Sequence, residues 1–198
     1  MNYLAHIYLS GENDQVKVGN FIGDWVKGND HKNYPVDIQR GILMHRNIDS
    51  FTYNHPIVRK SKMRLNEKYH KYSGIIIDIY YDHFLACNWN LFSEIELTDF
   101  TRNLNTCLVS HMSYLPTEIQ EFIPGFMKRG WIESYATLEG IEKVLVGISK
   151  HTSLPDKTID AIDILKKQYE VFKTEFFDYF PELVAHIEDK FQFEIKRL

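Results

Sequence analysis

Acidic and histidine side chains interrupt apolar helical segments in this sequence, and their spacing could support chemistry. His45 and Asp49 stand four positions apart in an otherwise apolar segment, and Asp78 and Asp82 repeat that spacing further along the chain. Residues four apart lie on one face of an α-helix. We therefore interpret each pair as oxygen and nitrogen donors that one helix presents in one direction.

Two further donors stand in similarly apolar surroundings. Asp24 lies beside Trp25 in residues 19–25, and His6 lies in the middle of the first apolar segment. An unpaired carboxylate in an apolar core is costly, so buried acids need partners or a cation. The four acids together exceed what the nearby Arg46 and the imidazoles can neutralise. A divalent cation can neutralise them.

The donor types limit which metal such a site would bind. Carboxylate and imidazole without thiolate suit Mn²⁺, Mg²⁺, Fe²⁺ or Zn²⁺ in a catalytic rather than a structural site. Cys87 and Cys107 lack the paired spacing of a zinc cluster. The structural alternative is that each residue belongs to a helix pair or a buried ion network. Three similar segments on three predicted helices shift the balance toward a metal site.

Composition excludes several classes of protein. The residues are 44% hydrophobic and 25% charged, and this composition rules out wholesale disorder. A chain of 198 residues is long enough for one domain with a sizeable core. A net charge of −4 gives no general attraction to nucleic acid. No apolar run is long enough to span a membrane, and the first ten residues lack the basic start of a signal peptide. Because the chain has only two Cys, we expect the protein to lie in the reducing cytoplasm.

The elements that must position the donors are predicted to be helices almost throughout. Apolar residues recur every three or four positions in residues 3–8, 18–25 and 38–51, with breaks at residues 10–14, 27–30 and 54–56. Residues 74–88 fit a buried helix better than a strand. Further helices are predicted at residues 97–115, 131–150 and 158–180, and Pro181 is expected to end the last of these. We predict one all-α domain of about eight to ten helices.

A basic run follows the segment of His45 and Asp49. Residues 59–71 hold six Lys and Arg residues against one acid, Glu67, in a chain whose net charge is negative. Such a run is most often a solvated helix face. On an otherwise acidic protein it is also what a docking site for an acidic partner looks like.

Four segments together resemble a known family. They are Asn2-Tyr-Leu-Ala-His6, Gly19-Asn-Phe-Ile-Gly-Asp24, Gly41-Ile-Leu-Met-His45-Arg-Asn-Ile-Asp49 and Asp78-Ile-Tyr-Tyr-Asp82-His-Phe. In order and spacing they resemble the acyl carrier protein phosphodiesterases, also called acyl carrier protein hydrolases. The resemblance runs from residue 2 to about residue 92. It continues more weakly through Trp131 and residues 144–147 and 177–181, so it covers nearly the whole chain.

The resemblance implies a fold, a reaction and a partner. The family is all-α and is regarded as a divergent relative of the HD-type metal phosphohydrolases, so a single HD-like domain is expected over residues 1–198. Its members remove 4′-phosphopantetheine from holo acyl carrier protein, with Mn²⁺ as the preferred metal, and leave the apo form. Acyl carrier proteins are small and strongly acidic. Their expected docking residues here are Arg59, Lys60, Lys62 and Arg64.

The resemblance also implies site residues. The expected metal ligands are first Asp24, His45 and Asp78, and then His6 and Asp82. HD-type enzymes usually carry an adjacent His-Asp pair, which this chain lacks. Relatives also carry basic residues, often two arginines, after the segment equivalent to residues 144–149. This chain has Lys-His-Thr at residues 150–152.

Three more residues are expected to take part in the reaction. Arg46 would hold a phosphate oxygen in the bidentate geometry that guanidinium allows. Asp49 would be either a further ligand or the acid that orients His45. His83 would protonate the leaving serine oxygen or orient a ligand. Cleavage also needs an activated water and neutralised phosphate oxygens, which a divalent cation supplies.

Two other functions would use the same residues. A hydrolase of a small nucleotide such as a guanosine polyphosphate would need the same acids and differ in its phosphate and base contacts. A non-catalytic helical module that binds an acidic protein would use the His and Asp side chains as a buried polar network and would hold no metal.

Overall fold

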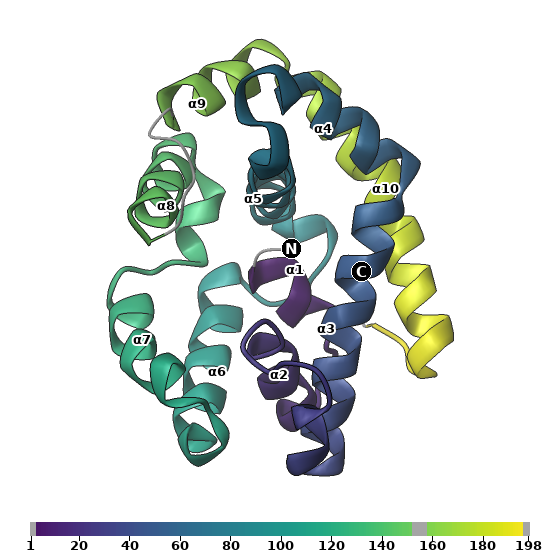
Figure 1. Ribbon diagram of the computed structural model, residues 1–198, viewed down its shortest axis with the longest axis vertical. Helices are drawn as coiled ribbons and strands as arrows, with labels where there is room; N and C mark the ends of the chain where they lie inside the picture. Colours follow the sequence, from purple (N-terminus) through teal and green to yellow (C-terminus); the bar gives the residue numbers. More distant parts are fainter. Residues whose placement is uncertain (1–2, 152–157, 196–198) are drawn as a thin grey trace.

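The computed structural model describes residues 3–151 and 158–195, and these residues form helices and connecting turns with no strand among them (Figure 1). Short 3₁₀ turns join several of the helices. The prediction of an all-α fold is therefore confirmed. The α-helices are α1 Tyr3–Tyr8, α2 Asp14–Phe21, α3 Val36–Asn54, α4 Pro56–Tyr69, α5 Ser73–Cys87, α6 Leu97–Ser110, α7 Thr117–Lys128, α8 Leu138–His151, α9 Thr158–Lys167 and α10 Tyr169–Phe191.

Local sequence signals explain the starts of α2 and α4, two helices next to those that carry the donors. Asn13 caps α2, because its side-chain oxygen accepts a hydrogen bond of 3.1 Å from the backbone N–H of Val16. Pro56 opens α4, where its missing N–H costs nothing. The predicted helix at residues 18–25 in fact lies earlier, as α2, so that Asp24 falls in the turn after it.

The prediction that Pro181 ends a helix is wrong. Helix α10 runs through Pro181, and the break lies instead at Gln168, between α9 and α10. Proline inside a helix removes one hydrogen bond and costs about 3 kcal/mol. Pro181 lies on the exposed side, while Phe180 and Leu183 beside it are buried, so continued burial of the apolar face outweighs the lost hydrogen bond.

Helices α3 and α5 carry most of the donors and lie at the centre of the helix contacts. Helix α3 packs against α2 and α10, whereas α5 packs against α1, α4, α8 and α10 (Figure 1). One hydrophobic core of buried residues joins these helices. The short helix α1 lies between α2 and α5, and this position brings His6 close to α3. No described helix has the length and apolarity needed to cross a membrane.

Candidate metal centre

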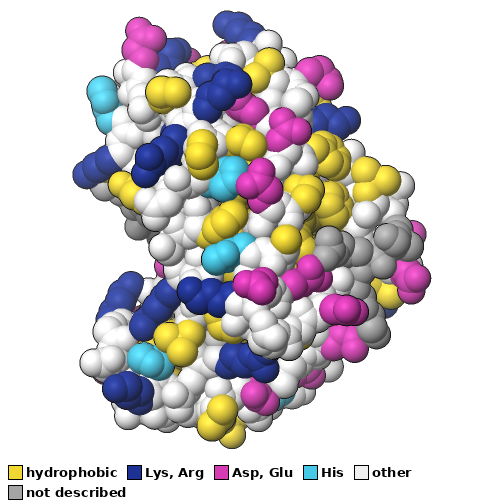
Figure 2. Space-filling view, turned by 90° about the vertical axis from the view of Figure 1, so that its right-hand side faces the viewer, with side chains coloured by type: hydrophobic (Ala, Val, Ile, Leu, Met, Phe, Trp, Pro, Cys, Tyr) yellow, Lys and Arg dark blue, Asp and Glu magenta, His cyan; other side chains and the backbone are white. Residues whose placement is uncertain are grey.

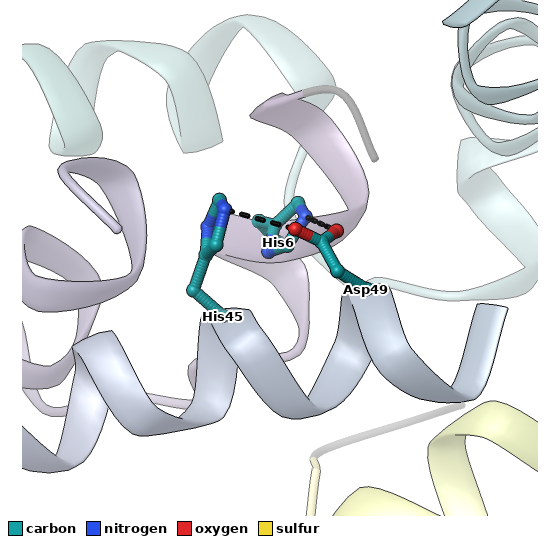
Figure 3. A group of neighbouring side chains, drawn as sticks. All are labelled: His6, His45 and Asp49. Atoms are coloured by element: carbon teal, nitrogen blue, oxygen red, sulfur yellow. Dashed lines mark ion pairs between the residues drawn. The ribbon is translucent and has the colours of Figure 1, made fainter. Parts of the chain in front are cut away.

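Side chains from α1 and α3 meet at one point. His45 and Asp49 point from α3 toward His6 on α1, and one ligand atom from each of the three lies within 4.8 Å of the other two (Figure 3). Nε2 of His6 lies 3.3 Å from Oδ1 of Asp49, and Nε2 of His45 lies 3.2 Å from Oδ2 of the same carboxylate. The two imidazole rings stack with their centroids 4.1 Å apart.

Asn20 fixes which nitrogen of each imidazole faces this point. Its Nδ2 donates hydrogen bonds to the carbonyl of His6 (2.8 Å) and to Oγ of Ser10 (2.9 Å), which leaves its Oδ1 as an acceptor for Nδ1 of His6 at 2.7 Å. The backbone carbonyl of Asn20 accepts from Nδ1 of His45 at 2.8 Å. Both Nδ1 atoms therefore carry a proton, and both Nε2 atoms turn toward the carboxylates.

This arrangement fits a divalent cation. Nε2 of His6 and Nε2 of His45 are buried and make no hydrogen bond of acceptable geometry, although each lies near a carboxylate oxygen. A neutral imidazole lone pair facing a carboxylate is repulsive unless a positive charge lies between them. Two imidazoles held by second hydrogen bonds, together with a carboxylate, form a donor set typical of Mn²⁺, Fe²⁺ or Zn²⁺. The described residues thus contain a His/Asp group that could hold a metal ion.

The pKa values report the same electrostatics. Burial, together with the neighbouring His45, lowers the pKa of His6 to about 4. Burial would also lower the pKa of His45, but the carboxylates of Asp24 and Asp49, each 3.2 Å from its Nε2, outweigh this effect and raise that pKa to about 9. The adjacent imidazole of His45 lowers the pKa of Asp24. The carboxylates around His45 therefore strongly favour a positive charge at its Nε2.

Glycines let α2 approach α3 closely enough to form the group. A Cβ on Gly19 would lie 2.1 Å from the carbonyl oxygen of Ile38, and a Cβ on Gly41 would lie 2.2 Å from that of Val16. A Cβ on Gly23 would lie 2.2 Å from the imidazole ring of His45. Any larger residue at these positions would push the two helices apart or displace the ring.

The group lies in the wall of a cavity of about 950 Å³, here called the site cavity. Asp24 and Asp78 also line it, and Oδ1 of Asp24 lies 3.2 Å from Nε2 of His45. Two cations, Arg129 and Lys143, face the same space. The other lining residues are mainly aromatic or aliphatic: Tyr3, Phe21, Trp25, Ile75, Phe122, Trp131 and Ile148. The site cavity therefore combines the candidate metal group in one wall with cationic and apolar side chains in the others.

Comparison with known proteins identifies the family. The family model for acyl carrier protein phosphodiesterase matches residues 1–183. The chain belongs to the acyl carrier protein phosphodiesterase family. Proteins of that name from Photorhabdus laumondii subsp. laumondii, Yersinia pestis and Serratia proteamaculans are 30%, 29% and 29% identical to it over 191 residues. Each alignment covers 96% of this chain and 96% to 99% of the relative. No solved structure matches the chain.

Not every residue that the family resemblance implied lies in the site cavity. Asp82 is fully buried and does not line it, and its two carboxylate oxygens accept hydrogen bonds of 3.0 and 3.1 Å from the backbone N–H groups of Leu4 and Ala5. Burial raises the pKa of Asp82 to about 7 against the effect of those hydrogen bonds. Asp82 holds the start of α1 in place and thereby positions His6.

His83 and Arg46 also form hydrogen bonds with groups outside the site cavity. His83 is buried, with Nδ1 2.7 Å from the carbonyl oxygen of Tyr135 and Nε2 3.0 Å from the hydroxyl of Tyr169. Arg46 donates hydrogen bonds of 2.8 Å to the backbone carbonyls of Gly28 and Val26. Neither His83 nor Arg46 lines the site cavity.

Sequence reasoning missed three residues of the site. Asn20 stands inside the quoted segment of residues 19–24, and a buried amide between two candidate donors is the signal that could have found it. Arg129 and Lys143 lie far from the quoted segments, and nothing local distinguishes them from other surface cations. The side chain of Lys150, where relatives carry basic residues, lies outside the described residues.

Proposed function

We propose that this protein hydrolyses the phosphodiester bond between 4′-phosphopantetheine and the serine of holo acyl carrier protein, and that Mn²⁺ is its preferred metal. The observation that carries the proposal is the meeting of His6, His45 and Asp49 in the wall of the site cavity, in a chain of this family. We treat residues 1–198 as one domain and place the reaction in the cytoplasm, as expected from the two free cysteines.

His6, His45 and Asp49 would hold the metal, with Asp24 close enough to His45 to join them. When bound, a divalent cation neutralises phosphate oxygens and lowers the pKa of water. Asn20 keeps both Nε2 atoms directed at the metal position. Asp82 anchors α1 and so maintains the distance of His6 from α3.

Cations of the chain would bind the remaining charge of the phosphodiester. Arg129 and Lys143 line the site cavity and enter it from the side of α7 and α8. Guanidinium and ammonium groups stabilise the negative charge that develops on phosphate oxygens during hydrolysis. We therefore assign to these two residues the phosphate contact that the sequence had suggested for Arg46, which is bound to the loop of residues 26–28.

The carrier protein would dock on α4. Figure 2 shows Lys and Arg side chains on the upper part of the molecule, where Figure 1 places α4, interspersed with Asp and Glu side chains, and a further group of Lys and Arg lower down. Arg59 is exposed there, and Lys62 lies with its Nζ 4.4 Å from the ring centroid of Tyr53. The exposed Lys60 and the half-buried Arg64 both pair with Glu175, so Arg59 and Lys62 have more freedom to meet an acidic partner.

Intact-protein mass spectrometry of holo acyl carrier protein, incubated with this protein and Mn²⁺, tests the proposal. We expect loss of the phosphopantetheine mass from the carrier protein, no loss with EDTA, and no loss with Asp49→Asn. Asp163→Asn, an exposed acid of α9, is the matched control and should retain activity.

Two negative results of this experiment would favour two different alternative functions. Tight Mn²⁺ binding without loss of the prosthetic group would overturn the proposed reaction and favour a small nucleotide such as a guanosine polyphosphate as substrate. Neither metal binding nor hydrolysis would favour a non-catalytic module that binds an acidic protein.

A further inference from the structure

A second cavity adjoins the site cavity. It has a volume of about 790 Å³, lies between α3, α4 and α5, and is here called the α4 groove. Three residues line both spaces: Asp49, Ile75 and Asp78. Because Asp49 belongs to the candidate metal group, the two cavities meet at the position proposed for the phosphodiester.

The two cavities differ in charge and in shape. The α4 groove is lined by the cations Arg59, Lys62 and Lys71, and it is the more open of the two spaces. The site cavity is lined mainly by aromatic and aliphatic side chains, with its two cations from the α7 and α8 side. An acidic protein surface complements the first cavity, and a slender, largely uncharged chain complements the second.

The phosphodiester of this substrate joins two unlike groups. One is the serine of an acidic folded protein, and the other is pantetheine, an uncharged chain with a carbon that bears two methyl groups, a hydroxyl, two amides and a terminal thiol. We propose, on the basis of the proposed function, that the carrier protein covers the α4 groove while the pantetheine arm extends into the site cavity toward Trp131 and Gly147. The scissile bond then lies where the two cavities meet, beside Asp49.

Trp131 and Gly147 form a fixed wall for the arm. Nε1 of Trp131 donates a hydrogen bond of 3.1 Å to the hydroxyl of the buried Tyr135, and the guanidinium of Arg129 lies 5.6 Å from the indole centroid. A Cβ on Gly147 would lie 3.2 Å from Cη2 of Trp131. Any larger side chain at position 147 would therefore press against the indole ring and narrow this end of the site cavity, where the arm would lie.

Two substrates separate the two arms experimentally: holo acyl carrier protein, and the methyl ester of 4′-phosphopantetheine, which carries the arm without the protein. Gly147→Val should lower kcat/KM at least about tenfold on both substrates, with Gly147→Ala intermediate. Arg59→Glu with Lys62→Glu should raise KM for holo carrier protein about tenfold at low salt, and by far less for the methyl ester. Lys32→Glu, an exposed cation outside both cavities, is the charge control.

Binding supplies a readout that does not depend on turnover. Calorimetry with 4′-phosphopantetheine should show weaker binding by Gly147→Val than by the wild type, while circular dichroism and Mn²⁺ affinity show that the variant is folded. Normal binding and turnover by Gly147→Val, in a wild type that cleaves holo carrier protein, would overturn the orientation alone. A wild type that binds the arm at the Gly147 wall but cleaves neither substrate would instead overturn the proposed function.

Discussion

Two buried carboxylates in this molecule have opposite surroundings. Glu175 of α10 is buried. Its Oε2 accepts hydrogen bonds of 2.5 Å from Oγ of Ser61 and 2.9 Å from Nη1 of Arg64, and its Oε1 forms an ion pair of 2.8 Å with Nη2 of the same guanidinium. Asp49 of α3 faces the Nε2 atoms of His6 and His45, which are titratable imidazoles and not fixed cations. The chain itself supplies a fixed positive charge to Glu175, whereas the group around Asp49 offers a cation several lone pairs.

The contrast separates a structural ion network from a candidate metal site. Both regions place an acid in apolar surroundings, so burial and residue type alone do not distinguish them. The distinction lies in the counter-charge, because the guanidinium of Arg64 gives Glu175 a fixed positive charge and removes the electrostatic need for a bound cation. Arg64, one of the expected docking residues, thereby also joins α4 to α10.

Removing the carboxylate of Asp49 is expected to have the largest effect. Asp49→Asn should lower kcat by roughly 1,000-fold or more, because several kcal/mol of metal-dependent stabilisation are lost with the ligand. The thermal midpoint should then no longer rise when Mn²⁺ is added. Steady-state kinetics and thermal scans with and without Mn²⁺ measure both effects. Unaltered Mn²⁺ stabilisation in this variant would break the comparison.

Removing the carboxylate of Glu175 should affect stability rather than chemistry. Glu175→Ala leaves Arg64 and Ser61 without their buried partner, and breaking such a pair costs about 3 kcal/mol of unfolding free energy. Urea denaturation measures this cost. Glu170→Ala, an exposed acid of the same helix, is the control and should be nearly neutral. The folded variant should still bind Mn²⁺, and loss of that binding would show that the two regions are coupled.

The orientation of the imidazoles of His6 and His45 provides a sharper test of the candidate metal group. Asn20→Ala removes the acceptor for Nδ1 of His6 and the donors to Ser10 and to the carbonyl of His6. Loss of such a supporting group typically lowers metal affinity by about 10- to 100-fold. Calorimetric titration with Mn²⁺ measures the change. An affinity equal to that of the wild type would mean that α1 and α3 orient the rings without the amide.

The smallest effect is expected from the exposed partner of Glu175. Lys60 is largely exposed and lies 3.5 Å from Oε1 of Glu175, so Lys60→Ala should change the unfolding free energy by less than about 0.5 kcal/mol. The guanidinium of Arg64 already neutralises the acid. A loss as large as that of Glu175→Ala, measured in the same denaturation series, would contradict this division between the two cations.

Much of the fold and part of the site could be predicted from the sequence. Helical periodicity is a local property, so the all-α architecture and the helices at residues 3–8, 38–51 and 74–88 were predicted correctly. The quoted segments pointed to the family that the comparisons confirm. Of the expected ligands, the structure brings His6 and His45 together with Asp49 and places Asp24 within 3.2 Å of His45. That these residues bind a metal stays a prediction.

Only the tertiary structure decided which similar residues have different roles. Asp78 and Asp82 share one helix face in the sequence pattern, yet Asp78 lines the cavities while Asp82 holds the start of α1. Spacing of four residues shows that two side chains lie on one face, but not which element packs against each of them. For the same reason Pro181 could remain inside α10, because burial of its neighbours depends on helices distant in sequence. The sequence by itself determined the helices and the donor types, and the packing of α1, α2 and α3 determined which donors meet.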